Sequence, residues 1–126
     1  MLKNKKILIV DDSISFRQII KTMLNDTGAV ICEAGSEFGM YNLIDEYGTL
    51  VDIIIMDLSL KYENGLNLIK KLREIHRYKD IPVIIITQHT SKHYVFEAKK
   101  LGVKHYIKKP INKTILIDRI TEVFTV

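Results

Sequence analysis

Three aspartates stand directly after short apolar runs, where a chain leaves a protein core. The run Ile-Leu-Ile-Val leads into Asp11 and Asp12, and the run Ile-Ile-Ile-Met leads into Asp57. Short runs rich in isoleucine and valine indicate strands that are buried on both faces. Carboxylates that converge at such strand ends repel one another unless a cation joins them, and Mg²⁺ prefers oxygen ligands. The pattern predicts a Mg²⁺ site formed by the three aspartates and a backbone carbonyl near Ser59, which points towards phosphate chemistry.

Two more strand candidates end on groups that suit phosphoryl transfer. Residues 83–86 run into Thr87, and residues 104–107 run into Lys108-Lys109-Pro110. If these ends lie beside the aspartates, Asp57 is free to act as a carboxylate nucleophile that forms an acyl phosphate. The metal, the Lys109 ammonium and the Thr87 hydroxyl would then neutralise the equatorial oxygens during in-line transfer.

Each of these residues alone is only a weak signal of phosphoryl chemistry, whereas their combination is a strong one. An aspartate after a strand is commonly only a helix cap, and a threonine or lysine at a strand end is usually unremarkable. The joint occurrence of acid, hydroxyl and ammonium at four strand ends, in order along the chain, is improbable by chance.

Strand-like and helix-like patterns alternate along the chain and predict how these groups are positioned. The strand candidates are residues 6–10, 30–34, 53–56, 83–86 and 104–107. Apolar residues recur between them at helical spacing, and residues 91–101 form the least amphipathic of these stretches, which suggests mobility or a partner surface. Five βα units with right-handed crossovers predict an α/β fold in one domain, residues 1–126, with a doubly wound five-stranded parallel sheet.

Local signals mark the ends of the predicted helices. Ser13 is a plausible cap for the first helix, and Asn64-Gly65 marks the turn that opens the third. Gly28, Gly48 and Gly102 stand just past helical segments, where a left-handed residue commonly ends a helix.

Composition excludes several classes of protein. The chain has 126 residues, 47% of them apolar and 27% charged, which is typical of a soluble globular protein. No apolar run is long enough to span a bilayer, and the basic N-terminus lacks a signal-peptide pattern. The single cysteine, Cys32, lies in an apparent strand and is interpreted as buried filler. The net charge of +4 reflects lysines in the last third, but without interleaved aromatics we expect no direct nucleic-acid binding.

These motifs together resemble the receiver domains of two-component response regulators, over nearly the whole chain. The residues that carry the resemblance are Val10-Asp11-Asp12-Ser13, Arg17, Ile55-Met56-Asp57-Leu58, Gly65, Thr87, Tyr106 and Lys109-Pro110. In combination these motifs are highly specific.

The resemblance implies a single receiver domain with the (βα)5 flavodoxin-like receiver fold. It implies that Asp57 is the phosphoacceptor, that Thr87 and Tyr106 form the switch, and that Lys109 rather than Lys108 bonds the phosphoryl group. It also implies a cis bond before Pro110, which is energetically reasonable because X–Pro bonds favour trans by only about 0.5–1 kcal/mol.

Partners and location follow from the same resemblance. The phosphoryl donor would be a sensor histidine kinase or a phosphotransfer protein, with Mg²⁺ as cofactor. The output would be a target protein or an attached domain that contacts the fourth helix, the fifth strand and the fifth helix. The protein would be a cytoplasmic signalling domain, without a membrane or nucleic-acid partner, and not an enzyme beyond its own phosphoryl transfer and dephosphorylation.

Four positions depart from the usual family pattern. Leu60-Lys61 replaces the Met-Pro often found after the acceptor, Gln88 replaces a small residue beside the switch threonine, and Ser59 cannot position an attacking water as an amide or carboxylate could. These departures favour a long-lived phosphorylated form.

Other functions remain open from the residues alone. A receiver that only binds protein would fit Gln88 and the altered loop, although such an adaptor gains nothing from clustered acids. An aspartyl phosphohydrolase of the haloacid dehalogenase type needs an acid where Ser59 stands, and a dinucleotide-binding domain needs a glycine-rich first turn. His89 and His93 have the i, i+4 spacing of metal ligands but no third ligand nearby.

Overall fold

Five parallel strands form the central sheet in the computed structural model, which describes residues 2–47, 51–61 and 63–125. The sheet order is β2-β1-β3-β6-β7. The strands are β1 (Lys6–Val10), β2 (Val30–Ala34), β3 (Ile53–Met56), β6 (Val83–Thr87) and β7 (His105–Lys108). The helices are α1 (Ile14–Leu24), α2 (Glu37–Tyr47), α3 (Gly65–Glu74), α4 (Lys92–Lys100) and α5 (Lys113–Phe124).

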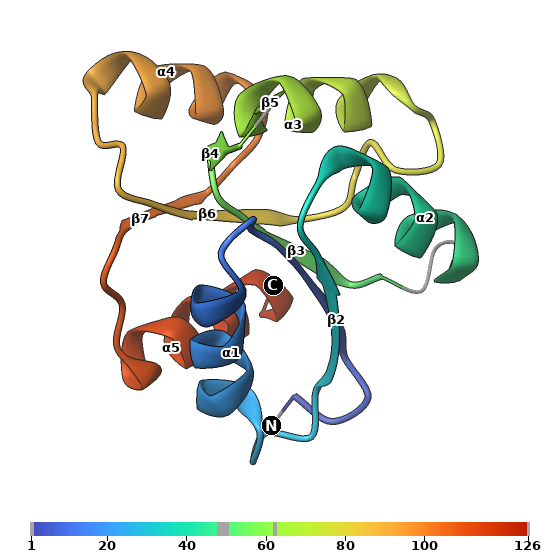
Figure 1. Ribbon diagram of the computed structural model, residues 1–126, viewed down its shortest axis with the longest axis vertical. Coiled ribbons are helices and arrows are strands. Elements are labelled where there is room, and N and C mark those ends of the chain that lie inside the picture. The colour runs from blue at the N-terminus through green and yellow to red at the C-terminus, as the bar shows by residue number, and fades with distance from the viewer. Residues whose placement is uncertain (1, 48–50, 62, 126) are drawn as a thin grey trace.

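The helices cover both faces of the sheet, which confirms the predicted doubly wound α/β fold. Figure 1 shows α1 and α5 on one face and α2, α3 and α4 on the other. The strands supply both cores because successive side chains point to opposite faces. In β1, Ile7 and Ile9 join the core under α1 and α5, whereas Leu8 and Val10 join the other core.

The strand order places the carboxyl ends of β1, β3, β6 and β7 side by side. Val10 of β1 is paired with Met56 of β3, and Thr87 of β6 is paired with Lys108 of β7. The residues that follow these strands therefore emerge at one edge, at the switch point where an open α/β sheet commonly binds ligands.

The helix-end signals in the sequence are largely confirmed. Ser13 caps α1 by accepting a hydrogen bond from the Phe16 amide at 3.1 Å, and Asn64 caps α3. Gly102 has a φ of +82° directly after the C-cap of α4, as expected for a left-handed helix end. Gly28 also has a positive φ but lies in the turn before β2. Gly48 lies outside the described residues.

A short antiparallel ribbon follows the third long strand and is absent from the sequence prediction. Its strands are β4 (Ser59–Leu60) and β5 (Glu63–Asn64). The Glu63 carboxylate accepts a hydrogen bond from the Glu37 amide at 2.7 Å, at the start of α2. The ribbon therefore connects the segment after Asp57 to a neighbouring helix.

Helix α4 buries little, as its weak amphipathic pattern predicted. Ala98 is its only fully buried side chain, and Phe96 is largely exposed. Among the helices of residues 2–47, 51–61 and 63–125, none is long and apolar enough to cross a bilayer.

Candidate functional site

Asp11 and Asp57 come together at the carboxyl edge of the sheet. Asp11 directly follows β1 and Asp57 directly follows β3, and the Asp57 amide donates a hydrogen bond to the Val10 carbonyl at 3.0 Å. The side chains of Asp11 and Asp57 are 2% and 7% exposed. Two adjacent carboxylates in such a buried position require a compensating cation.

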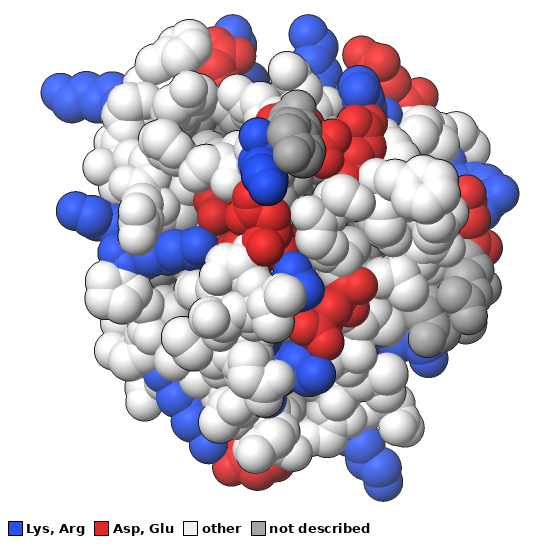
Figure 2. Space-filling view, viewed as in Figure 1, with Lys and Arg blue, Asp and Glu red and all other residues white. Residues whose placement is uncertain are grey.

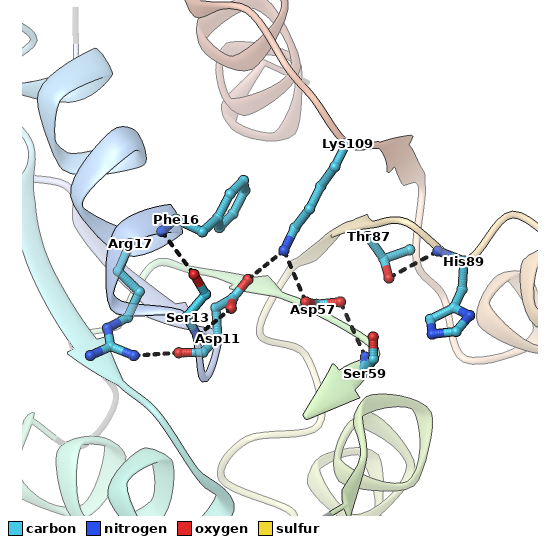
Figure 3. Close-up of polar contacts among 9 residues, drawn as sticks. All are labelled: Asp11, Ser13, Phe16, Arg17, Asp57, Ser59, Thr87, His89 and Lys109. Atoms are coloured by element: carbon cyan, nitrogen blue, oxygen red, sulfur yellow. Dashed lines mark hydrogen bonds and ion pairs between the residues drawn. The ribbon is translucent and has the colours of Figure 1, made fainter. Parts of the chain in front are cut away.

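Lys109 supplies that compensation. Its Nζ lies 3.0 Å from Oδ2 of Asp11 and 3.0 Å from Oδ2 of Asp57 (Figure 3). The lysine follows β7, where its amide donates to the Thr87 carbonyl at 2.8 Å. The Lys109–Pro110 peptide bond is cis, as the family resemblance implied. The structure thus brings together Asp57, Asp11 and the Lys109 ammonium, three of the groups that the sequence singled out.

The pKa values in this cluster follow from burial and charge. Burial raises the pKa of Asp11 above its ordinary 3.8, although the Ser13 amide and Lys109 both favour the charged form. Burial alone would lower the pKa of Lys109, but hydrogen bonds and charges from Asp11 and Asp57 outweigh it and raise that pKa above 10.5. The ammonium therefore stays protonated between two acids at neutral pH.

The remaining predicted metal ligands lie at the rim of this cluster. Asp12 is exposed, and so is Ser59, whose amide donates to Oδ1 of Asp57 at 3.1 Å. In the part of the chain that the structure describes, no three His, Cys, Asp or Glu side chains form a group that could hold a metal ion. The structure joins two of the three aspartates through Lys109, and the predicted Mg²⁺ site stays a prediction.

Thr87 and Tyr106 both contact the main chain of His89. Thr87 is fully buried, and its hydroxyl oxygen accepts a hydrogen bond from the His89 amide at 3.3 Å. The Tyr106 hydroxyl donates to the His89 carbonyl. Burial, with smaller effects of Tyr94 and Asp57, raises the pKa of Tyr106. No residue-type pattern predicts this role of His89, because both contacts use its main chain.

Arg17 holds the backbone of the first aspartate. Its guanidinium donates to the Asp11 carbonyl and also to the Glu33 carboxylate on β2, at 3.2 Å for the latter contact. Lys21 forms a second ion pair with Glu33 at 3.0 Å. This network links α1, β2 and the turn that follows β1, and so holds that turn in place.

We expect Glu33→Gln to remove a pH-dependent part of the stability. The hydrogen bond from Lys21 lowers the pKa of Glu33 below 4.5, burial opposes this effect, and Arg17 adds to it. A lowered acid pKa stabilises the fold above pH 4.5, and this contribution is lost as the pH falls through the lowered value. Urea unfolding should show that the variant's free energy of unfolding is lower than that of wild type by less than about 1 kcal/mol at pH 7. This difference should shrink towards pH 3. Glu74→Gln, an exposed glutamate on α3, is the control, and a deficit that does not change with pH would contradict the assignment.

Gly65 allows α3 to begin against the backbone of Asp57 and Leu58. A Cβ atom at this position would lie 2.5 Å from the Asp57 carbonyl oxygen and 2.8 Å from the Leu58 Cα. These are backbone atoms, so a side chain cannot be accommodated by rotation of a neighbour. The family's turn glycine is therefore required here by the close approach of two main-chain segments.

Gly65→Ala should accordingly destabilise the protein by about 1–3 kcal/mol through overpacking. Gly39→Ala is a matched control because Gly39 also lies in the first turn of a helix, where a Cβ would meet only ordinary contacts at 3.4 Å. That control should be neutral or stabilising, by up to about 1 kcal/mol. Equal effects of the two substitutions on the free energy of unfolding would show that the close approach of Gly65 to the backbone of Asp57 and Leu58 does not affect stability.

Acidic and basic side chains lie next to one another on the face that holds this cluster. Figure 2 shows acidic side chains gathered near its centre, with basic side chains beside them. A hollow of about 580 Å³ lies elsewhere, lined by residues from the amino ends of β6 and β7, among them Pro82, Val83 and His105. None of the sequence-predicted site residues lines it.

Comparison with known proteins defines the family. The family model for the response regulator receiver domain matches residues 7–121, so the chain belongs to the response regulator receiver domain family. Chemotaxis protein CheY1 of Helicobacter pylori is 36% identical over 116 residues, which cover 91% of this chain and 93% of that protein. A CheY homologue of Campylobacter jejuni is 35% identical over 119 residues, which cover 94% of this chain and 91% of that protein.

Solved structures agree on the fold. The structure of Vibrio cholerae chemotaxis protein CheY4 matches with a TM-score of 0.86 at 29% identity, and the match covers 94% of this chain and 98% of that chain. The resemblance inferred from the motifs and the flavodoxin-like receiver fold are both confirmed.

Proposed function

We propose that Asp57 accepts a phosphoryl group from a phosphohistidine on a sensor kinase or phosphotransfer protein. An Asp57 carboxylate oxygen forms a bond to phosphorus while the phosphorus–nitrogen bond of the donor breaks. The imidazole leaves with the bonding electron pair and takes up a proton. The product is an acyl phosphate on Asp57. The observation that carries this proposal is the buried acid pair that shares Lys109 at the switch point of the sheet.

The surrounding groups have roles that fit this chemistry. Lys109 can stay bonded to Asp11 while its remaining protons bond to a phosphoryl oxygen on Asp57. Thr87 lies at the end of the adjacent strand and can donate its hydroxyl to a second oxygen. Both groups would stabilise negative charge on the phosphoryl oxygens, which is the basis of catalysis by positioned charges.

The residues present fit a divalent cation by charge. The two buried carboxylates and Lys109 carry a net charge of −1, and exposed Asp12 beside them brings this to −2. Carboxylates and a backbone carbonyl are the oxygen ligands of Mg²⁺, so Asp11, Asp12, Asp57 and the Ser59 carbonyl would hold it. Bound there, Mg²⁺ would supply further neutralisation of the phosphoryl oxygens.

The consequence of phosphorylation would be a switch in the surface formed by α4, β7 and α5. The new charge draws Thr87 inward, and because Thr87 and Tyr106 contact the same residue, Tyr106 responds. Exposed Phe96 and nearby lysines on this surface suit a target with apolar and acidic groups. The protein would act only on itself, in the cytoplasm, as a signalling domain and not as an enzyme with a separate substrate.

The test is to incubate the protein with acetyl phosphate and Mg²⁺ and to measure its intact mass. We expect the mass of one phosphoryl group to be added, and a chelator to suppress the addition. Borohydride reduction of the acyl phosphate followed by peptide mapping should place homoserine at residue 57. Absence of an adduct, or an adduct at another residue, would refute the proposal.

A receiver that works only as a protein-binding adaptor is the second candidate. It is favoured by the exposed position of Asp12 and by the absence, among the residues described, of a three-acid group suited to a metal. Titration of Mg²⁺ while amide resonances are followed would separate the two functions. Shifts at Asp11, Asp57 and Ser59 that saturate at millimolar Mg²⁺ support the phosphoacceptor, and unchanged spectra support the adaptor.

A further inference from the structure

The ring of Phe16 lies over the Lys109 ammonium. The distance from Nζ to the ring centroid is 3.9 Å, and Figure 3 shows the ring beside the end of the lysine side chain. A cation within about 6 Å of an aromatic centroid is attracted to the negative face of the ring. Lys109 Nζ therefore has three partners, of which two are charged and one is neutral.

Independent elements hold the ring and the ammonium in place. Phe16 lies in the first turn of α1, where its amide donates to the Ser13 hydroxyl oxygen at 3.1 Å. Helical side chains lean towards the N-terminus of their helix, which directs this ring to the end of β1. Lys109 is fixed from the other side by the hydrogen bond that its backbone amide donates to the Thr87 carbonyl.

The ring differs from Asp57 in what phosphorylation does to it. An acyl phosphate on Asp57 replaces the carboxylate that Lys109 contacts, whereas the ring is unchanged by the reaction. The ring also covers the lysine side chain, which is only 14% exposed. It restricts a flexible four-carbon chain to the orientation in which the ammonium faces the acceptor.

We infer that Phe16 is a positioning residue for phosphoryl transfer, because its ring holds Lys109 against the acceptor site before and after Asp57 is modified. This inference rests on the proposed function. Phe16 also packs at the edge of the core formed with α1 and α5, so its effect on Lys109 must be separated from an effect on packing.

The first experiment observes the contact directly and does not depend on phosphorylation. In protein with ¹³C-labelled lysine, the ring current should move the Lys109 ε-methylene resonances upfield from those of the exposed lysines. Phe16→Leu should return them to the common position, and Phe16→Tyr should keep them displaced. Lys109 resonances that are the same in wild type and Phe16→Leu would overturn the inference.

The second experiment measures the rate of phosphorylation by acetyl phosphate in a double-mutant cycle. Phe16→Leu should slow the reaction by about threefold to tenfold, which is the range of a partly buried cation–π contact, and Phe16→Tyr should restore it. In a Lys109→Met background, Phe16→Leu should have no further effect. Slowing by the same factor in both backgrounds would assign the effect to packing and overturn the inference.

Phe124→Leu provides the matched control. Phe124 is likewise a half-buried aromatic of the same core and lies under a lysine, with Lys5 Nζ 4.7 Å from its ring centroid, but it is at the end of α5. We expect the wild-type rate of phosphorylation and unchanged Lys109 resonances, and a rate as low as that of Phe16→Leu would contradict a specific role. A wild-type protein that acquires no phosphoryl group would instead overturn the proposed function, while the resonance experiment would still report on the contact.

Discussion

Asp57→Asn should abolish phosphorylation, with a reduction of at least about two orders of magnitude in adduct formation from acetyl phosphate. A carboxamide lacks the anionic oxygen that forms the acyl phosphate. The fold should remain intact, because the amide oxygen can still accept the hydrogen bond from the Ser59 amide. The change also removes one of two adjacent buried acids and leaves Lys109 paired with Asp11. We therefore expect the free energy of unfolding to stay within about 1 kcal/mol of wild type, or to increase.

Asp11→Asn is the informative control for this result. It removes the same charge from the same cluster but leaves the acceptor carboxylate in place. Intact-mass measurements should show slower phosphorylation that still maps to residue 57. A stable adduct on Asp57→Asn, or a complete loss in Asp11→Asn alone, would reverse the roles assigned to the two acids.

Lys109→Met should destabilise the protein at neutral pH by about 2–4 kcal/mol, because it leaves two buried acids without their shared cation. The Oδ2 atoms of Asp11 and Asp57 each lie 3.0 Å from Nζ, so they are at most about 6 Å apart. At this separation, two buried carboxylates repel each other strongly. Urea unfolding at pH 7 in the absence of divalent ions measures the loss. Lys108→Met is the matched control, because Lys108 is the neighbouring residue and its side chain is exposed.

The pH dependence of this loss has a defined sign. The raised pKa of Asp11 means that the folded protein takes up a proton more readily than the unfolded chain, so acid relieves the repulsion in the variant. The raised pKa of Lys109 means that its contribution in the wild type is present below pH 10.5 and is lost as the pH rises through the higher folded value. The deficit of Lys109→Met should shrink both in acid and in strong alkali, and a constant deficit would contradict the ion-pair account.

Much of the fold and part of the site follow from short-range patterns in the sequence. Isoleucine-rich runs specify buried parallel strands, and the residue after each run must emerge at the same edge of the sheet. Asp11, Asp57, Thr87 and Lys109 could therefore be placed together without coordinates. The predicted boundaries differ only in the last two strands: β6 extends one residue further, to Thr87, and β7 is shifted by one residue at both ends, to His105–Lys108.

The contacts that the sequence could not predict depend on side-chain conformation and on distant backbone. The Glu63 bond to the start of α2 joins residues 26 positions apart, and the short ribbon that presents Glu63 has no hairpin signal. The Tyr106 hydroxyl reaches a main-chain carbonyl, which has no residue-type signature. Convergent acids indicate that a cation is needed but not which one, so the sequence could not show that Lys109 bridges Asp11 and Asp57.

The double contact at His89 has a consequence for divergence within the family. The Thr87 hydroxyl oxygen accepts a hydrogen bond from the amide of this residue, and the Tyr106 hydroxyl donates one to its carbonyl. Neither connection uses the imidazole. A substitution of the side chain at position 89 can therefore leave both connections intact, although it would remove the ring contact of His89 with Tyr94. Proline is the exception, since it has no amide hydrogen and would cut the link to Thr87 alone.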